Sequence, residues 1–190
     1  ARKPPSTCRA FTPMQAWGAE GHEPVMIENG RGCVLRDQHG REYLDGNASI
    51  WTNIHGHNHP AINAAIIEQL GKVAHTSFLG FSHAPAALLA KELVDVLPGG
   101  KMERVFFSDD GSTAIECAVR MALQFWRQNG RPERDTIVAF DRAYHGDTLG
   151  AASLGGIPTF KGSANHFGYR VLRVQSLDEL RELSPERLAA

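Results

Sequence analysis

Residues 105–117, VFFSDDGSTAIEC, join an apolar run to a helical pattern through a turn of two acids, a glycine and two hydroxyl residues. A turn between a strand and a helix leaves the first backbone N–H groups of the helix free, beside the positive end of the helix dipole. That arrangement suits a phosphate group. Gly111 would let the backbone approach an anion closely, and Ser112 and Thr113 would add hydroxyl donors.

The same turn also fits an ordinary capped helix start. Thr113 and Glu116 have the spacing of a capping box, and Glu116 with Arg120 fits an exposed ion pair on successive turns. The neighbouring acids Asp109 and Asp110 disfavour a bare anion, although they can orient the loop or other atoms of a ligand. The local pattern therefore leaves a phosphate site and a simple helix cap both open.

The elements around this turn indicate an α/β domain. Hydrophobic periodicity predicts, in order, the strand Arg104–Ser108, a helix over 112–129, the strand Thr136–Phe140 and the strand Tyr169–Val174. A strand–helix–strand unit implies a right-handed crossover and a parallel sheet. Because ligands bind outside the carboxyl ends of such strands, we expect the turn 108–112 and the loop 141–148 to face one crevice.

The N-terminal part of the chain has a different pattern. Turn residues at Asn29-Gly30 and from Asp37 to Gly40 separate three short apolar runs, which predicts a small antiparallel meander. We therefore divide the chain into an irregular segment with this meander over residues 1–60, and helices with the first part of a ligand-binding domain over residues 61–190.

Two helices are predicted between the meander and the α/β pattern. One begins at Pro60, and the other begins near Pro85 and ends before Pro98. Their helical spacing assigns the following apolar residues to inward faces: Ile62, Ala65, Ile66, Leu70 and Val73 in the first helix, and Leu88, Leu89, Leu93 and Val96 in the second.

A second candidate loop, AYHGDTLGA at residues 143–151, carries an aromatic, a histidine and an aspartate between glycines. Tyr144 could stack on a flat ligand. The alternative is a structural loop in which His145 and Asp147 bond the backbone, and the loop taken alone favours that reading at least as much.

The loop before Pro60 contains HGHNH at residues 55–59. Alternating histidines can ligate a metal, yet no carboxylate or cysteine is placed to complete the set. We therefore expect no metal site. Trp51, in the same loop, is either a core aromatic or a wall of a ligand pocket.

Composition and missing motifs exclude several functions. The chain of 190 residues has a formal net charge of -1, which gives no electrostatic footprint for nucleic acid or an anionic membrane. No apolar run approaches a membrane span, and the basic N-terminus lacks the apolar core of a secretory signal. The scattered cysteines Cys8, Cys33 and Cys117 favour reduced thiols in a cytoplasmic protein. The dinucleotide fingerprint GxGxxG, the P-loop and the hydrolase motif GxSxG are absent.

Two stretches together, FFSDDGSTAIECAVRMALQFW (106–126) and AFDRAYHGDTLGA (139–151), resemble the class III aminotransferases. These are pyridoxal 5′-phosphate (PLP) enzymes of fold type I. The resemblance implies a set of cofactor-binding residues, with the phosphate held by Gly111 and Ser112, and the pyridine ring stacked on Tyr144 with His145 and Gly146 beside it.

Three further stretches are similar to the branch of this family that converts 8-amino-7-oxononanoate to 7,8-diaminononanoate in biotin biosynthesis: FTPMQAW (11–17), LDGNASIWTNIHGHNHP (44–60) and VAHTSFLGFSHAPAALLAKELV (73–94). The resemblance implies that Trp51 and Phe11 contact substrate or amino donor, and that Asp147 lies near the substrate amine. Some members carry two tryptophans at Ile50-Trp51 and a tyrosine at Phe11. S-adenosylmethionine and lysine therefore both remain open as amino donor, with a keto acid as acceptor.

The resemblance also implies what the chain lacks. In the family, the Schiff-base lysine, the aspartate at the ring nitrogen and a carboxylate-binding arginine come from the later part of the chain. None of the lysines here matches that Schiff-base lysine: Lys3, Lys72, Lys91, Lys101 and Lys161. We therefore expect no catalytic residue in this chain and no transamination by the chain alone.

The ends of the chain favour the same interpretation. SPERLAA at residues 184–190 has the pattern of a helix start with too few residues to form a stable helix, and Ala1 is not an initiator methionine. We expect an N-terminal portion of a homodimeric PLP-dependent transaminase. The alternatives are another class III transaminase acting on ω-amino acids, and a non-catalytic α/β module that binds a phosphate ligand.

Overall fold

The computed structural model describes residues 13–17, 24–100, 102–158 and 169–183. The chain forms two compact units, Ala1–Ala84 and Pro85–Ala190, and each is treated by itself. The division of the chain at residue 60 stays a prediction. It separates a meander from a helical region, whereas the two units are defined by contacts. The expected helix start at 184–190 lies outside the described residues.

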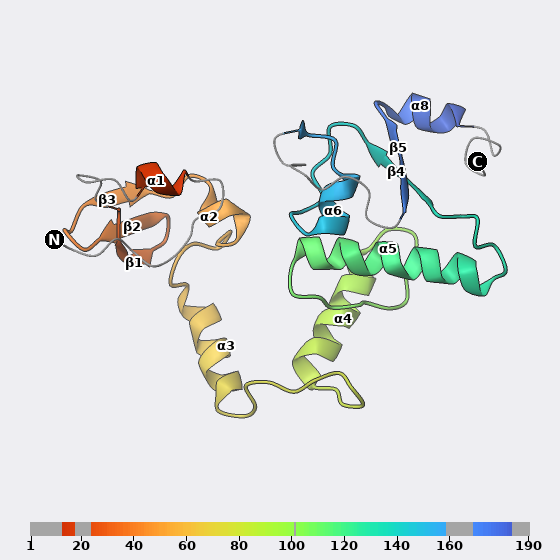
Figure 1. The fold of residues 1–190 in the computed structure, drawn as a ribbon. Helices are drawn as coiled ribbons and strands as arrows, with labels where there is room; N and C mark the ends of the chain where they lie inside the picture. The colour runs from red at the N-terminus through yellow and green to blue at the C-terminus, as the bar shows by residue number, and fades with distance from the viewer. Residues whose placement is uncertain (1–12, 18–23, 101, 159–168, 184–190) are drawn as a thin grey trace. The chain divides into compact units, whose positions relative to one another are not determined.

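The first unit contains the predicted meander. After the short helix α1 (Met14–Trp17), the strands β1 (Ile27–Arg31), β2 (Val34–Asp37) and β3 (Glu42–Leu44) form an antiparallel sheet in the order β1-β2-β3. Leu35 is central to the register, since it faces Gly30 on one side and Tyr43 on the other. The meander seen in Figure 1 confirms the predicted antiparallel arrangement and the turn after Asp37. The turn predicted at Asn29-Gly30 is wrong, because both residues pair with β2 inside β1 and the chain turns at Gly32 and Cys33.

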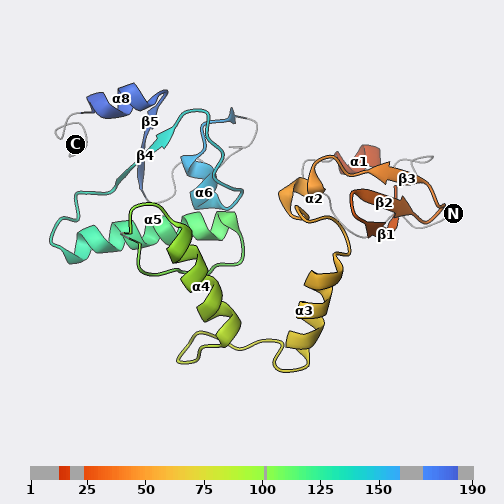
Figure 2. The same cartoon turned by 180° about the vertical axis from the view of Figure 1, so that it is seen from behind.

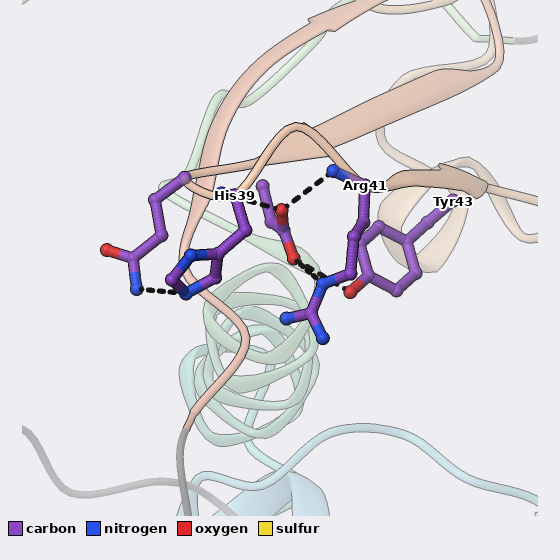
Figure 3. Close-up of polar contacts among 5 residues, drawn as sticks. His39, Arg41 and Tyr43 are labelled. Carbon is purple, nitrogen blue, oxygen red and sulfur yellow. Dashed lines mark hydrogen bonds and ion pairs between the residues drawn. The ribbon is translucent and has the colours of Figure 1, made fainter.

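A buried carboxylate closes the β2–β3 hairpin (Figure 3). Asp37 is fully buried, and its Oδ1 accepts hydrogen bonds from the backbone N–H groups of His39 at 2.9 Å and Arg41 at 3.0 Å. Its Oδ2 accepts from Arg41 Nε at 2.7 Å and from the Tyr43 hydroxyl at 2.9 Å. Burial by itself would raise the pKa of Asp37, but these hydrogen bonds outweigh it and hold the pKa well below its ordinary value.

We expect this carboxylate to make stability depend on pH. The folded pKa of Asp37 lies below the unfolded value of 3.8, so its contribution is complete above that value and declines as pH falls through the folded pKa. In the protein expressed at its full length, Asp37→Asn should lower the urea midpoint at pH 7, and the difference from wild type should shrink below pH 4. Glu42→Gln, which alters an exposed pair with Arg36 in the same sheet, is the control. A difference for Asp37→Asn that stays constant from pH 7 to pH 2 would contradict the assignment.

Three helices follow the meander: α2 (Ala48–Trp51), α3 (Pro60–Leu70) and α4 (Ala84–Val96). The helix starts predicted near Pro60 and Pro85 are confirmed. The predicted inward faces are wrong for the described part of the chain, since Ile66, Leu88 and Val96 are 53%, 60% and 77% exposed. An apolar helix face is buried only when another surface covers it, and no described segment covers these two faces.

The second unit contains a long helix and a short parallel sheet. Its elements are α5 (Gly111–Gln128), β4 (Thr136–Phe140), α6 (Leu149–Leu154), β5 (Arg170–Val174) and α8 (Leu177–Glu182). β4 and β5 pair in parallel, with Val138 opposite Leu172. The two opposite views in Figures 1 and 2 both show α6 beside α5, and the two helices are in contact.

The predicted strand Arg104–Ser108 is not a strand in this structure. These residues have no regular secondary structure, and Phe106 is 62% exposed. A strand needs a neighbour to complete its ladder of hydrogen bonds, and the parallel sheet of the described residues contains only β4 and β5. The predicted parallel arrangement therefore rests on β4 and β5, not on the segment before α5.

A small core lies beneath α6. Its buried apolar residues come from β4, α6, β5 and the end of α8: Ala139, Ala151, Ala152, Leu154, Val174 and Leu183. This core fixes α6, and with it the loop that precedes it, against the sheet.

None of the helices in the described ranges has the length and apolar character needed to cross a bilayer.

Candidate functional site

The turn at the start of α5 is capped by an aspartate. Asp110 is the N-cap residue, and its Oδ1 accepts from the backbone N–H of Thr113 at 2.8 Å, while the Thr113 hydroxyl accepts from the backbone N–H of Asp110 at 3.0 Å. The predicted capping box of Thr113 with Glu116 is therefore wrong, because the observed box lies three residues earlier, between Asp110 and Thr113. Asp110 has extended backbone angles and precedes the helix, so it is the residue placed to reach the N3 amide.

This cap leaves two donors free. Among the described residues, no hydrogen bond uses the backbone N–H of Gly111 or Ser112. They occupy the first two positions of an 18-residue helix, where unsatisfied N–H groups and the positive end of the dipole coincide. A Cβ added at Gly111 would meet nothing within 4 Å, so the space beside this turn is open.

The structure brings the second loop directly onto this turn. The backbone N–H of Asp147 donates to Ser112 Oγ at 3.2 Å. Gly146 is buried with φ of +126°, and a Cβ there would lie 2.8 Å from Ser112 Cα. Such close contact is open only to glycine at this position. The turn 108–112 and the loop 141–148 therefore lie in contact, although they do not follow two paired strands, and the crevice between them stays a prediction.

Glu116 holds the two segments together from the next turn of α5. Its Oε1 accepts from Thr148 Oγ1 at 2.6 Å and from the backbone N–H groups of Gly150 at 2.7 Å and Ala151 at 3.2 Å. The predicted exposed pair of Glu116 with Arg120 is therefore wrong. The carboxylate instead satisfies the free amides at the start of α6, which is where a negative charge is stabilised.

Loss of the Glu116 carboxylate should loosen the loop. We expect Glu116→Ala to destabilise the protein by about 1.5–3 kcal/mol, because charge-assisted hydrogen bonds to partly buried amides are lost. The measurement is the urea midpoint of the protein at full length. Glu133→Ala, which removes a carboxylate paired with Arg131 in an exposed turn, should change it by less than about 0.5 kcal/mol. Equal effects of the two variants would refute the role of Glu116.

Tyr144 and His145 belong to the loop that contacts the start of α5. Tyr144 is 49% exposed, and its hydroxyl donates to Asp147 Oδ2 at 2.7 Å. That hydrogen bond, followed by burial and the charges of Asp147 and Asp110, raises the pKa of the phenol, so the hydroxyl stays protonated as a donor at neutral pH. His145 Nε2 is buried and has no hydrogen-bond partner among the described residues.

The donors and spaces here fit a flat ligand that carries a phosphate. The two free amides and the hydroxyl hydrogen of Ser112 can donate to anionic oxygens, and the half-exposed ring of Tyr144 offers an aromatic face. An unpartnered buried nitrogen, as in His145, is uncommon in folded proteins and is consistent with a missing ligand group. The residues present therefore fit the PLP that the sequence resemblance implies.

The predicted substrate residues are only partly placed. Asp147 belongs to the loop at α5, whereas Trp51 belongs to the first unit and is 78% exposed. Phe11 lies outside the described residues. The sequence reasoning missed Glu116 as a loop anchor. The sequence signal for this role was the Thr148-Leu149-Gly150 pattern, which is typical of a second helix start. That helix start lies close to Glu116 in space but 32 residues away in the chain.

His57 and two lysines of the described ranges are paired with carboxylates. His57 Nε2 lies 2.7 Å from Asp45 Oδ2, and no group of three His, Cys, Asp or Glu in those ranges could hold a metal ion. Lys72 pairs with Glu68 at 2.6 Å, and Lys91 pairs with Asp95, both along helix surfaces. Lys3, Lys101 and Lys161 lie outside the described residues.

Comparison with known proteins agrees with this geometry. The class III aminotransferase family profile matches residues 17–188. The adenosylmethionine-8-amino-7-oxononanoate aminotransferase of Aquifex aeolicus (strain VF5) is 42% identical over 181 residues, covering 93% of this chain and 39% of the Aquifex protein. The protein of the same name from Geobacter sulfurreducens is 49% identical over 152 residues, covering 80% of this chain and 33% of its own length.

Solved structures match the fold. The adenosylmethionine-8-amino-7-oxononanoate aminotransferase of Methanocaldococcus jannaschii superposes with a TM-score of 0.79 at 37% identity, covering 87% of this chain and 38% of its own. A transaminase from the marine bacterium Virgibacillus superposes with a TM-score of 0.84 at 30% identity, covering 97% and 44%. The chain thus spans less than half the length of each of these relatives. It belongs to the class III aminotransferases and has the N-terminal part of their type I fold.

Proposed function

We propose that this chain forms the cofactor-phosphate cup and part of the substrate wall of a PLP-dependent transaminase that converts 8-amino-7-oxononanoate to 7,8-diaminononanoate. The observation that carries the cofactor assignment is the contact of Asp147 with Ser112, which closes the Tyr144 loop over two free helix amides. Family membership makes PLP the ligand to expect in such a cup.

The roles of the residues follow from their donors and surfaces. The amides of Gly111 and Ser112 and the Ser112 hydroxyl bind and orient the phosphate, and Tyr144 covers one face of the ring. When bound, PLP supplies an electron sink that lets an amino group pass from donor to acceptor. Asp147 fixes the hydroxyl of Tyr144 and offers its carboxylate to the substrate amine, while His145 can donate from Nε2 toward the ligand.

The substrate assignment rests on sequence identity. The relatives named for 8-amino-7-oxononanoate are 42% and 49% identical to this chain, whereas the omega transaminase of Pseudomonas jessenii, solved in complex with PMP, is 26% identical. Its TM-score of 0.80 is as high as that of the Methanocaldococcus enzyme, 0.79, so the fold does not separate the two activities. The names of the relatives favour S-adenosylmethionine over lysine as donor. We further infer a cytoplasmic homodimer.

A direct assay tests this function. The protein expressed at its full length should develop a visible absorbance band on adding PLP, and should form 7,8-diaminononanoate from 8-amino-7-oxononanoate with S-adenosylmethionine. Diamine formed only with lysine would change the donor and keep the reaction. Turnover of ω-amino acids without any diamine would support the other class III activity, and PLP binding without turnover of any donor would support the non-catalytic module.

A further inference from the structure

The segment Ala48–Trp51 has a backbone conformation that ordinary residues avoid. Ala48, Ser49, Ile50 and Trp51 have φ of +52°, +51°, +58° and +65°, so α2 is a left-handed turn built without glycine. Each such residue costs free energy because Cβ approaches a carbonyl oxygen, and the cost is greatest for β-branched Ile50. Strain of this kind persists only where the surroundings impose it, and it gathers at functional sites.

A carboxylate holds this turn, together with the N-cap residue Asn47, whose Oδ1 accepts from the backbone N–H of Ile50. Asp45 Oδ1 accepts from the backbone N–H of Ser49 at 3.0 Å, and Oδ2 accepts from the Ser49 hydroxyl at 2.8 Å. The side chain of Asp45 is only 7% exposed. The amide of Ser49, followed by His57 and the Ser49 hydroxyl, lowers the pKa of Asp45 to about 2, so it is a charged acceptor at neutral pH.

His57 ties this carboxylate to the meander. Its Nε2 lies 2.7 Å from Asp45 Oδ2, and its backbone exchanges two hydrogen bonds with Gly32, at 2.8 Å and 3.0 Å, in the β1–β2 turn. Asp45 itself donates its backbone N–H to Cys33 O at 2.9 Å. The left-handed turn is therefore linked through Asp45 and His57 to Cys33 and Gly32, in the turn between β1 and β2.

The strain is not offset by burial of the turn's own side chains. Ile50 and Trp51 are 70% and 78% exposed within the described chain, so the turn presents two large apolar groups outward. We propose that Asp45 and His57 are positioning residues that hold this turn so that Trp51 faces the acceptor substrate. The proposal rests on the function given above, which places Trp51 in the substrate wall.

The test combines kinetics with hydrogen exchange on the protein expressed at its full length. Asp45→Ala should raise KM for 8-amino-7-oxononanoate on the order of tenfold or more, while PLP affinity stays within about twofold. Exchange in a peptide spanning residues 45–54 should speed up at least tenfold, since the Ser49 amide loses its Asp45 acceptor and the turn that keeps the Ile50 and Trp51 amides on Asn47 loosens. Glu42→Gln, an exposed carboxylate change in the same unit, should leave both readouts unchanged.

A second substitution separates positioning from general folding. Glycine adopts positive φ without strain, so Ala48→Gly in the Asp45→Ala background should recover at least half of the lost KM effect and slow the exchange of residues 45–54. Ser49→Ala, which removes one of the three contacts of Asp45, should shift both readouts less and in the same direction.

The outcomes are distinct. An unchanged KM and unchanged exchange in Asp45→Ala overturn the proposal. A loss of PLP affinity and a lower urea midpoint that Ala48→Gly does not restore also overturn it, because they indicate a purely structural role. If the wild-type protein makes no diamine, the proposed function fails, while the exchange data still decide whether Asp45 holds the turn.

Discussion

Gly146→Ala should abolish most cofactor binding, with PLP affinity lowered at least 100-fold in the protein expressed at its full length. Two costs act together. The backbone at Gly146 has φ of +126°, where an L-residue is strained by about 1–3 kcal/mol. The added Cβ would also overlap Ser112, and overpacking of this kind costs about 1–3 kcal/mol.

The loop can relieve that overlap only by moving away from α5. Such a movement would break the hydrogen bond from Asp147 to Ser112 and carry Tyr144 away from the free amides. The measurement is a PLP titration followed by absorbance, alongside the urea midpoint of each variant.

Gly130→Ala is the matched control. Gly130 ends the long helix with φ of +72°, but a Cβ there would meet nothing within 4 Å. This variant should therefore lose stability through strain alone and keep wild-type PLP affinity. If Gly146→Ala binds PLP as tightly as Gly130→Ala does, the close contact with Ser112 does not build the cup.

Ser112→Ala should weaken PLP binding by about 1.5–3 kcal/mol, which corresponds to about 10- to 150-fold in affinity. The hydroxyl accepts from the amide of Asp147, so its own hydrogen is available for an anionic oxygen. Alanine removes both interactions while preserving a residue suited to a helix. The measurement is the same titration, with the urea midpoint to separate affinity from folding.

Ser176→Ala provides a serine change at another helix start. The Ser176 hydroxyl caps α8 by accepting from the backbone N–H of Glu179 at 3.1 Å, on a helix that the cup does not use. Its loss should cost about 0.5–2 kcal/mol of stability without changing PLP affinity. Unaltered affinity in Ser112→Ala would remove the serine from the phosphate site.

Gly111→Ala tests whether the open space beside Gly111 holds the cofactor phosphate. A Cβ at Gly111 has open space in the structure and no unusual φ, so the protein should fold as wild type does. It should nevertheless bind PLP less tightly, because the new methyl group would occupy the space where the phosphate approaches the backbone. Wild-type affinity would place the phosphate elsewhere.

Much of the secondary structure could be predicted from the sequence because it depends on local patterns. The turn residues from Asp37 to Gly40 predicted the β2–β3 hairpin, and the alternation of apolar runs placed β4 and β5 within one residue. The long helix after Gly111 follows from its period and from Gly130 at its end. Neighbouring residues alone determine hairpin turns, helix ends and strand periods, so one sequence suffices to find them.

Three of the misassigned features depend on a partner far along the chain or on a covering surface, whereas the misplaced capping box is a local error. Glu116 has an arginine at helical spacing, yet its carboxylate bonds a helix start 32 to 35 residues away. Arg104–Ser108 has the composition of a strand but no neighbour to pair with among the described residues. The apolar residues of α3 and α4 follow the helical period that predicts a buried face. That period does not specify which surface covers the face, and these residues are exposed in the described chain.

The sequence by itself determined the family, a helix start near Ser112 and the residue types of the cup, because those reside in short runs of adjacent residues. Only the tertiary structure decided that Asp147 closes on Ser112, that Gly146 must be glycine, and that Glu116 anchors α6. It also revealed the left-handed turn at Ala48–Trp51 held by Asp45. The physical reason is that hydrogen bonds and steric contacts form between neighbours in space, which chain spacing does not specify.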